Sequence, residues 1–115
     1  MALGKEQFEA VCAACHQEDG EGQEGVARSL VGSPWVLSSP ARLVRIVVHG
    51  KEGEMLMPPL GANMSDEQVA AVLTYIRRSW GNDASPVSVE QVEEERGEAG
   101  SRQQPWTEEE LTAIR

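Results

Sequence analysis

The sequence predicts an all-α fold with three main helices and a short helical extension at the C-terminus. Apolar residues recur at helical spacing in three stretches, capping residues bound two of them, and two further helix-start signals follow residue 81. A chain of 115 residues suits one domain. We expect a main domain over residues 1–81 and an extension over residues 82–115, either docked as short helices or partly disordered as a connector.

The first helix is predicted over residues 3–15. Gly4 and Phe8 share a face of this helix, because they lie four positions apart. A small residue one turn before an aromatic residue permits a close crossing, which we expect to involve the C-terminal helix of the main domain. The apolar positions at helical spacing are Leu3, Phe8, Val11, Cys12 and Cys15.

The second helix is predicted over residues 40–49. Ser39 suits the N-cap, Pro40 suits the first helical position, and Gly50 suits the C-cap. The aliphatic and β-branched residues of this stretch would also suit a buried strand. The capping signals at both ends favour the helix.

The third helix has the clearest boundary signals. Ser65 and Gln68 form a capping box at its start, and Gly81 is placed to end it. Arg77 and Arg78 lie in its last turn, where the helix dipole favours cations. One face is apolar and carries Val69, Val72, Leu73, Ile76 and Trp80.

The extension is acidic, with three basic and nine acidic residues, whereas residues 1–81 have seven and ten. Ser88 and Thr107 each begin a helix-start signal. Trp106, Leu111 and Ile114 could dock the extension on the main domain.

Cys12, Cys15 and His16 form the pattern C-x-x-C-H, which is typical of covalent attachment of c-type haem. Residues three apart on a helix point the same way, so each cysteine can form a thioether with one haem vinyl group. His16 can then bind the iron as the proximal ligand. The motif predicts one covalent haem c.

The loop over residues 51–64 contains three methionines that could supply a second axial ligand. Met57 is the best candidate, because the prolines after it stiffen the backbone around a weak thioether ligand. Met55 and Met64 have the usual role of methionine, in the core or on the surface. His49 is the rival ligand, although a histidine at a helix C-terminus is often only a favourable dipole partner.

The composition is compatible with a bound haem and argues against nucleic-acid-binding, disulfide-rich and membrane-spanning proteins. Aromatic residues make up only 4% of the chain, and a buried porphyrin would supply missing core volume. The net charge of −9 argues against nucleic-acid binding, which needs a basic surface. Both cysteines lie in the motif, so no disulfide framework is expected, and no apolar run is long enough to span a membrane.

These features resemble a class I c-type cytochrome domain over residues 3–81. The haem motif ends an N-terminal helix, Met57 lies before two prolines in a loop, and Gly4, Phe8 and Tyr75 match the family's crossing helices. More narrowly, parts of the chain are similar to cytochrome domains fused to bacterial quinone-dependent sugar dehydrogenases: residues 32–37, 45–50, 74–82 and 105–107.

The resemblance implies a cytochrome c fold wrapped round one haem, with one-electron transfer rather than catalysis as the function. It implies His16 and Met57 as axial ligands. In the family, Trp or Tyr and Arg groups bond the haem propionates, so Trp35, Arg42 and Arg45 are candidates here. Core packing for Trp35 and solvated helix charges for the two arginines are equally open.

One departure from the family concerns the partner of the His16 ring. The family usually has a proline about a dozen residues later, whose carbonyl accepts a hydrogen bond from the ring N–H. This chain has no proline over residues 27–30. A carbonyl of Arg28 or Ser29 could serve instead, in a loop that we expect to be less rigid.

Three other functions stay open at this point. A haem enzyme or gas sensor would leave the sixth coordination site open, so Met57 would not bind. A thiol redox protein would use Cys12 and Cys15, but no strand pattern precedes the motif. A zinc site could use Cys12, Cys15 and His16 with His49, but the spacing matches no common zinc motif.

The resemblance implies a redox donor such as a quinone-dependent dehydrogenase and an acceptor such as another cytochrome or an oxidase. We expect a monomer that acts in the periplasm or another extracytoplasmic compartment. The first residues contain no apolar signal-peptide region. We therefore expect that a leader or a parent chain is absent from this sequence.

Overall fold

The computed structural model describes residues 2–17, 20–22, 29–37, 39–51, 60, 64–99 and 104–113, with the backbone alone at residues 2, 14, 15, 99 and 108. Within these residues, β-type pairing is confined to one parallel bridge between Lys51 and Trp106. The all-α prediction is therefore confirmed. In chain order the helices are α1 (Ala2–Gln7), η1 (Phe8–Cys12), α2 (Ala13–His16), α3 (Pro34–Leu37), α4 (Pro40–His49), α5 (Asp66–Arg78), α6 (Val89–Ala99) and α7 (Glu108–Thr112).

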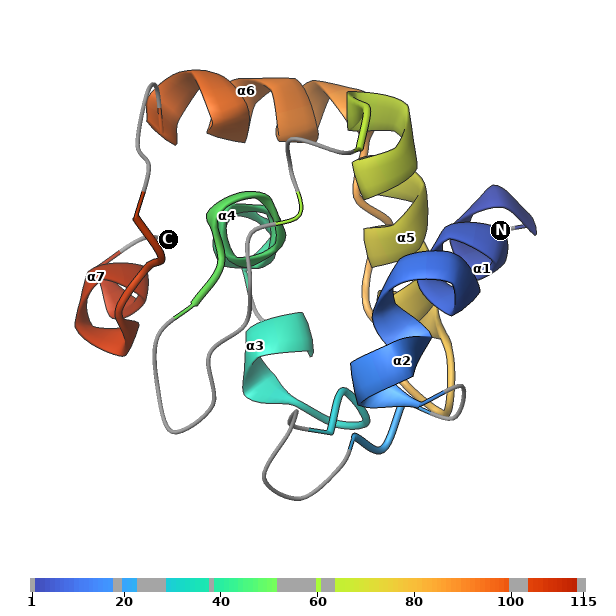
Figure 1. Ribbon diagram of the computed structural model, residues 1–115. Helices are drawn as coiled ribbons and strands as arrows, with labels where there is room; N and C mark the ends of the chain where they lie inside the picture. The colour runs from blue at the N-terminus through green and yellow to red at the C-terminus, as the bar shows by residue number, and fades with distance from the viewer. Residues whose placement is uncertain are drawn as a thin grey trace.

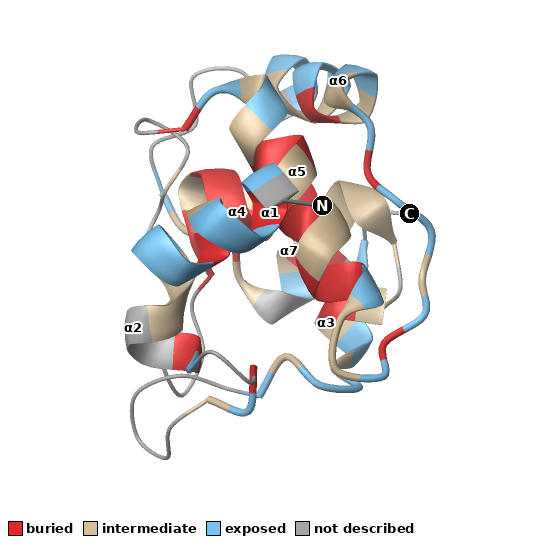
Figure 2. Cartoon of the chain, turned by 90° about the vertical axis from the view of Figure 1, so that its right-hand side faces the viewer, coloured by how far each residue is buried: buried red, intermediate tan, exposed pale blue. Residues whose placement is uncertain are grey.

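Helix α4 lies at the centre of the molecule (Figure 1). Helix α5 stands on one side of it and α7 on the other, while α6 runs across one end of both α4 and α5. Helix α1 lies along the outer side of α5. Figure 2 shows that buried residues are concentrated on α4 and α5, whereas much of α6 is exposed. The main core cluster includes Phe8, Val44, Val69, Leu73 and Val92.

The N-terminal helix contains one wide turn. The Ala13 N–H donates to the Phe8 carbonyl, five residues earlier, which defines a π-helical turn over η1. The helix is therefore confirmed, but its regular apolar spacing is not. Leu3 is 43% exposed and Val11 is 38% exposed. Val11 lies within the wide turn, which interrupts the regular periodicity, whereas Leu3 lies before that turn and off the buried face that Phe8 occupies.

Helix α1 crosses α5 closely, as predicted from Gly4 and Phe8. An ideal Cβ on Gly4 would lie 2.2 Å from the Ala71 carbonyl oxygen and 2.9 Å from Tyr75 Cβ. The Phe8 ring centroid lies 5.6 Å from that of Tyr75 and 5.2 Å from that of Trp80. The absence of a side chain at residue 4 thus brings the aromatic rings into contact.

The capping signals place α4 and the start of α5 where the sequence predicts them. The Gly50 N–H donates to Ile46 O over 2.7 Å at a φ of +87°, which ends α4. At the start of α5, the Gln68 N–H donates to Ser65 Oγ over 3.1 Å, and the Ser65 N–H donates to Gln68 Oε1 over 2.9 Å. Residues 40–49 are therefore helical rather than a strand.

Helix α5 ends three residues before Gly81. Ser79 takes an extended conformation, and its hydroxyl donates to the Tyr75 carbonyl over 2.5 Å. Trp80 then adopts a φ of +56° and Gly81 a φ of +89°. Trp80 therefore lies beyond the helix, rather than on its apolar face as the spacing predicted.

The extension packs on the main helices through its described residues. Val92 and Leu111 are fully buried and Trp106 is 8% exposed. Arg45 on α4 bonds Glu95 on α6 over 2.8 Å, and Arg96 lies 2.7 Å from an Asp66 carboxylate oxygen. These contacts join α6 and the region of residues 106–111 to the main helices, and Ile114 lies outside the described residues. The division at residue 81 stays a prediction.

Candidate functional site

The haem motif lies at the C-terminal end of the N-terminal helix. Cys12 ends η1 and His16 ends α2. The next residue, Gln17, has a φ of +67°, a conformation that non-glycine residues adopt rarely. Its N–H donates to Ala13 O over 2.9 Å, and this bond closes the last turn. The chain therefore leaves the helix directly after His16.

Of the motif's described side chains, His16 is buried and Cys12 is half-buried. His16 is 9% exposed, and Cys12 packs against the main core cluster. For Cys15 the structure describes the backbone, which is helical and three residues beyond Cys12. Two thiols and a buried imidazole at one helix end form the donor set that a covalent haem requires. The residues present therefore fit the group.

The segment after His16 folds back and is held by backbone hydrogen bonds. The Gly22 N–H donates to His16 O over 2.9 Å, and the Leu30 N–H donates to Gly20 O over 2.6 Å. The Gly20 backbone packs directly against the Trp80 indole ring. A Cβ built at residue 20 would lie only 2.6 Å from that ring. This contact joins the segment to the end of α5.

Met57 and Met55 lie outside the described residues, so the role of Met57 as a ligand stays a prediction. The two ends of the loop that carries them are described. The Trp106 N–H donates to Gly50 O over 3.0 Å, and Arg96 Nη2 donates to Met64 O over 2.8 Å. Met64 is 5% exposed and belongs to the main core cluster, which is the ordinary role expected of it.

The three candidate propionate contacts lie along the face between α4 and the extension. Arg42 Nη2 donates to Thr112 O over 3.1 Å. Arg45 bonds Glu95, and its guanidinium carbon lies 5.2 Å from the Trp106 ring centroid. Trp35 packs against the cluster of Ile46, Trp106 and Leu111, whereas Cys12 packs against the other cluster. Their contact with propionates stays a prediction.

His49, the rival axial ligand, is half-buried at the last position of α4. A favourable interaction with the helix dipole stays the expected role of a histidine at this position. Its role as a ligand remains the open alternative to Met57.

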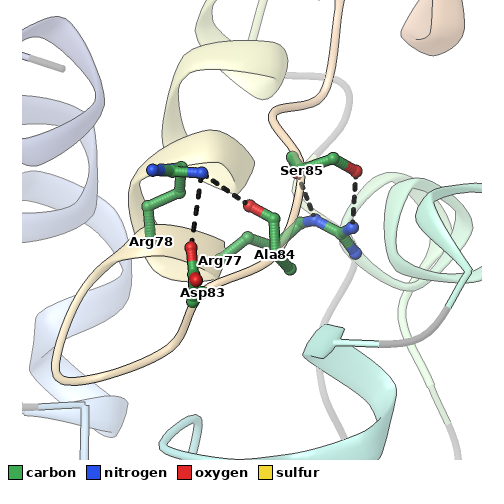
Figure 3. Close-up of polar contacts among 5 residues, drawn as sticks. All are labelled: Arg77, Arg78, Asp83, Ala84 and Ser85. Carbon is green, nitrogen blue, oxygen red and sulfur yellow. Dashed lines mark hydrogen bonds and ion pairs between the residues drawn. The ribbon is translucent and has the colours of Figure 1, made fainter.

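Sequence reasoning missed Arg77, which was expected to be a charge at the helix end. Arg77 is only 2% exposed, and its Nη1 donates to Val36 O over 2.8 Å. Figure 3 shows the bonds from its guanidinium to Ser85, including the 2.8 Å bond from Nε to Ser85 O. Burial lowers the pKa of the Arg77 guanidinium from its usual value. This side chain ties α5 to α3 and to the start of the extension.

The structure bears on two of the alternative functions, the thiol redox site and the zinc site. The residues before Cys12 are helical, which argues against a strand-to-helix thiol redox site. Among the side chains that are described, no three of His, Cys, Asp and Glu gather as a metal site, and Cys15 is not in that set. No helix in the described part of the chain is long and apolar enough to cross a membrane.

A protein-family model matches residues 1–76, and its description is cytochrome c oxidase, cbb3-type, subunit III. The matched residues include the haem motif, α4 and most of α5. Among solved structures, the c-type cytochrome XoxG from Methylobacterium extorquens AM1 matches with a TM-score of 0.56 and 28% identity. That match covers 80% of this chain and 64% of XoxG.

Two curated relatives are cytochrome subunits of dehydrogenases. The fructose dehydrogenase cytochrome subunit of Gluconobacter japonicus is 35% identical over 114 residues, covering 89% of this chain and 23% of that protein. The quinone alcohol dehydrogenase cytochrome c subunit of Gluconacetobacter polyoxogenes is 33% identical over 90 residues, covering 70% and 19%. The chain thus spans about a fifth of the length of these relatives.

Proposed function

We propose that this chain, which belongs to the cytochrome c family described as cbb3-type cytochrome c oxidase subunit III, is a one-electron relay between a dehydrogenase and a further acceptor. As a c-type cytochrome domain it carries one covalent haem c, so the resemblance stated from the sequence is confirmed. Bound haem c supplies a one-electron couple at its iron. The match of residues 1–76, with the haem motif at a buried helix end, carries the proposal.

In this proposal Cys12 and Cys15 would hold the haem covalently, each through one thioether bond to a haem vinyl group. His16 is the proximal ligand, and its burial supports this role. Met57 is the second axial ligand. The hydrogen bonds at the two described ends of this loop, Gly50 and Met64, support a ligand from within it.

Two protein ligands leave no coordination site for a substrate, so the proposed role is that of a carrier. Arg42, Arg45 and Trp35 remain proposed partners of the propionates. An open sixth site would instead make the chain a haem enzyme or a gas sensor. The spectrum of the haem-loaded protein distinguishes these functions, because ligation by methionine gives the ferric protein a weak far-red band.

The proposed donor is a quinone-dependent dehydrogenase, because two relatives are named as cytochrome subunits of fructose and quinone alcohol dehydrogenases. The proposed acceptor is another cytochrome or an oxidase. A net charge of −9 favours docking on a basic surface. We place the function in the periplasm or another extracytoplasmic compartment, where haem is attached to c-type cytochromes, and we propose a monomer.

The experiment compares the ferric absorption spectra of the haem-loaded parent, Met57→Ala and Met64→Leu. We expect the far-red band in the parent and in Met64→Leu, because Met64 is a core residue. Met57→Ala is expected to lose the band, keep its haem and show a lower reduction potential. A high-spin ferric parent would refute the carrier, and a band that survives Met57→Ala would transfer the ligand role to another residue.

A further inference from the structure

Asn82 is a buried polar residue that joins two distant segments. It is 7% exposed and follows the end of α5. Its side-chain Nδ2 donates to Leu30 O over 3.1 Å and to Ile76 O over 2.9 Å. Its Oδ1 accepts from the Gly32 N–H over 2.8 Å. A single amide therefore holds residues on both sides of Val31 against the last turn of α5.

Further backbone hydrogen bonds connect Leu30 with His16 by way of Gly20 and Gly22. Leu30, whose carbonyl accepts from Asn82, donates its own N–H to Gly20 O over 2.6 Å. The next connection is between the Gly22 N–H and His16 O, at 2.9 Å. Trp80, two residues before Asn82, backs the same segment at Gly20. The turn after α5 thus supports the segment that leaves the proximal ligand at two points.

The chain needs such support because no proline lies between His16 and Pro34. The backbone of this segment therefore has no covalent restriction of φ. A planar amide can satisfy two carbonyls and one N–H at once, because it carries two donors and an acceptor. Aspartate has the shape of asparagine but cannot donate to the two carbonyls when it is ionised.

We propose that Asn82 is a positioning residue for the proximal side of the haem, acting through the segment that follows His16. This inference rests on the proposed function, since it takes His16 as the axial ligand. Asn82 touches neither the iron nor a reacting atom. Its effect is to fix the backbone on which the orientation of the His16 ring depends.

The test compares the haem-loaded parent with Asn82→Ala, Asn82→Asp and a matched control, Thr74→Val. Thr74 also bonds across to the extension from α5, since its Oγ1 donates to Val87 O over 3.1 Å and accepts from the Val87 N–H over 2.9 Å. The control therefore removes two hydrogen bonds from the same helix without touching the segment after His16. Two readouts are used: amide hydrogen exchange at Leu30 and Gly32, and the paramagnetic NMR shifts of the haem methyls in the ferric state.

Asn82→Ala is expected to speed exchange at both Leu30 and Gly32 by about tenfold or more. Asn82→Asp loses the bonds to the Leu30 and Ile76 carbonyls but keeps an acceptor for the Gly32 N–H, so its faster exchange is expected at Leu30. Both variants should also change the spread of the haem methyl shifts, which reports the orientation of the axial ligands. Thr74→Val should change neither readout. Methyl shifts in Asn82→Ala that equal those of the parent would overturn the proposal, and so would shifts that change equally in Thr74→Val.

Further outcomes are measured on the parent or at the proximal ligand and do not depend on how well the Asn82 variants fold. In the parent itself, a Gly32 amide that exchanges at the rate of an unprotected peptide would overturn the role of Asn82. A parent that binds no covalent haem, or whose low-spin spectrum survives His16→Ala, would refute the proposed function instead. The failure of one proposal can therefore be distinguished from the failure of the other.

Discussion

At the scale of single residues, a few buried or half-buried polar side chains connect segments that lie far apart in the sequence. Arg77 reaches Val36, and Arg96 reaches Met64. These contacts could not be predicted from the sequence, because a basic residue at a helix end ordinarily stays in water. The removal of such a side chain leaves a buried acceptor unpaired, which costs about 1–3 kcal/mol.

Gly4 provides the sharpest prediction at this scale. We expect Gly4→Ala to lower the free energy of unfolding by about 1–3 kcal/mol, because the new Cβ would overlap the Ala71 carbonyl oxygen. Gly97→Ala is the matched control. Among the described residues outside its own helical turn, nothing lies within 4 Å of a Cβ built on Gly97 in α6, so this change should raise stability by about 0.5–1 kcal/mol.

Urea unfolding of the two glycine variants beside the parent measures both changes. If Gly4→Ala proved as stable as Gly97→Ala, the close crossing of α1 and α5 would be wrong.

At the scale of elements, helix boundaries were predictable because their signals are local. The capping boxes at Ser65 and Thr107 and the C-cap at Gly50 involve bonds between residues no more than four apart. The wide turn of η1 was not predictable, since its residues carry no distinguishing local signal. The end of α5 was also misplaced, because Ser79 and Trp80 leave the helix before Gly81.

The docking of α7 leads to the element-scale prediction. Leu111 is fully buried, in a cluster with Ile46 and Trp106. We expect Leu111→Ala to lower the free energy of unfolding by about 2–5 kcal/mol, because it removes apolar contacts and leaves a cavity. Leu3→Ala is the control, since Leu3 is 43% exposed and its change should stay within about 0.5 kcal/mol.

Denaturant midpoints with unchanged slopes provide this comparison. Equal losses in the two leucine variants would mean that α7 does not contribute a buried leucine to the fold.

At the scale of the whole molecule, the sequence predicted the fold class and the haem motif but not the position of the extension. Short motifs identify a haem-binding domain because the chemistry demands fixed spacing at Cys12, Cys15 and His16. The docking of the described residues of the extension, 82–99 and 104–113, depends instead on long-range contacts, such as Arg45 with Glu95, that an acidic composition does not reveal. The Met57 ligand likewise depends on how a loop meets the iron, and it remains a proposal.

The most direct test of the account is the intact mass of the chain, matured in cells that attach haem to c-type cytochromes, before and after acid–acetone extraction. We expect an added mass of one haem that survives extraction, because thioether bonds hold it. Cys12→Ser should still retain its haem through the one remaining thioether, and the double change with Cys15→Ser should make the haem extractable. A parent chain whose haem is extracted completely, or that gains no mass at all, would contradict the assignment of residues 12–16 as a covalent haem site.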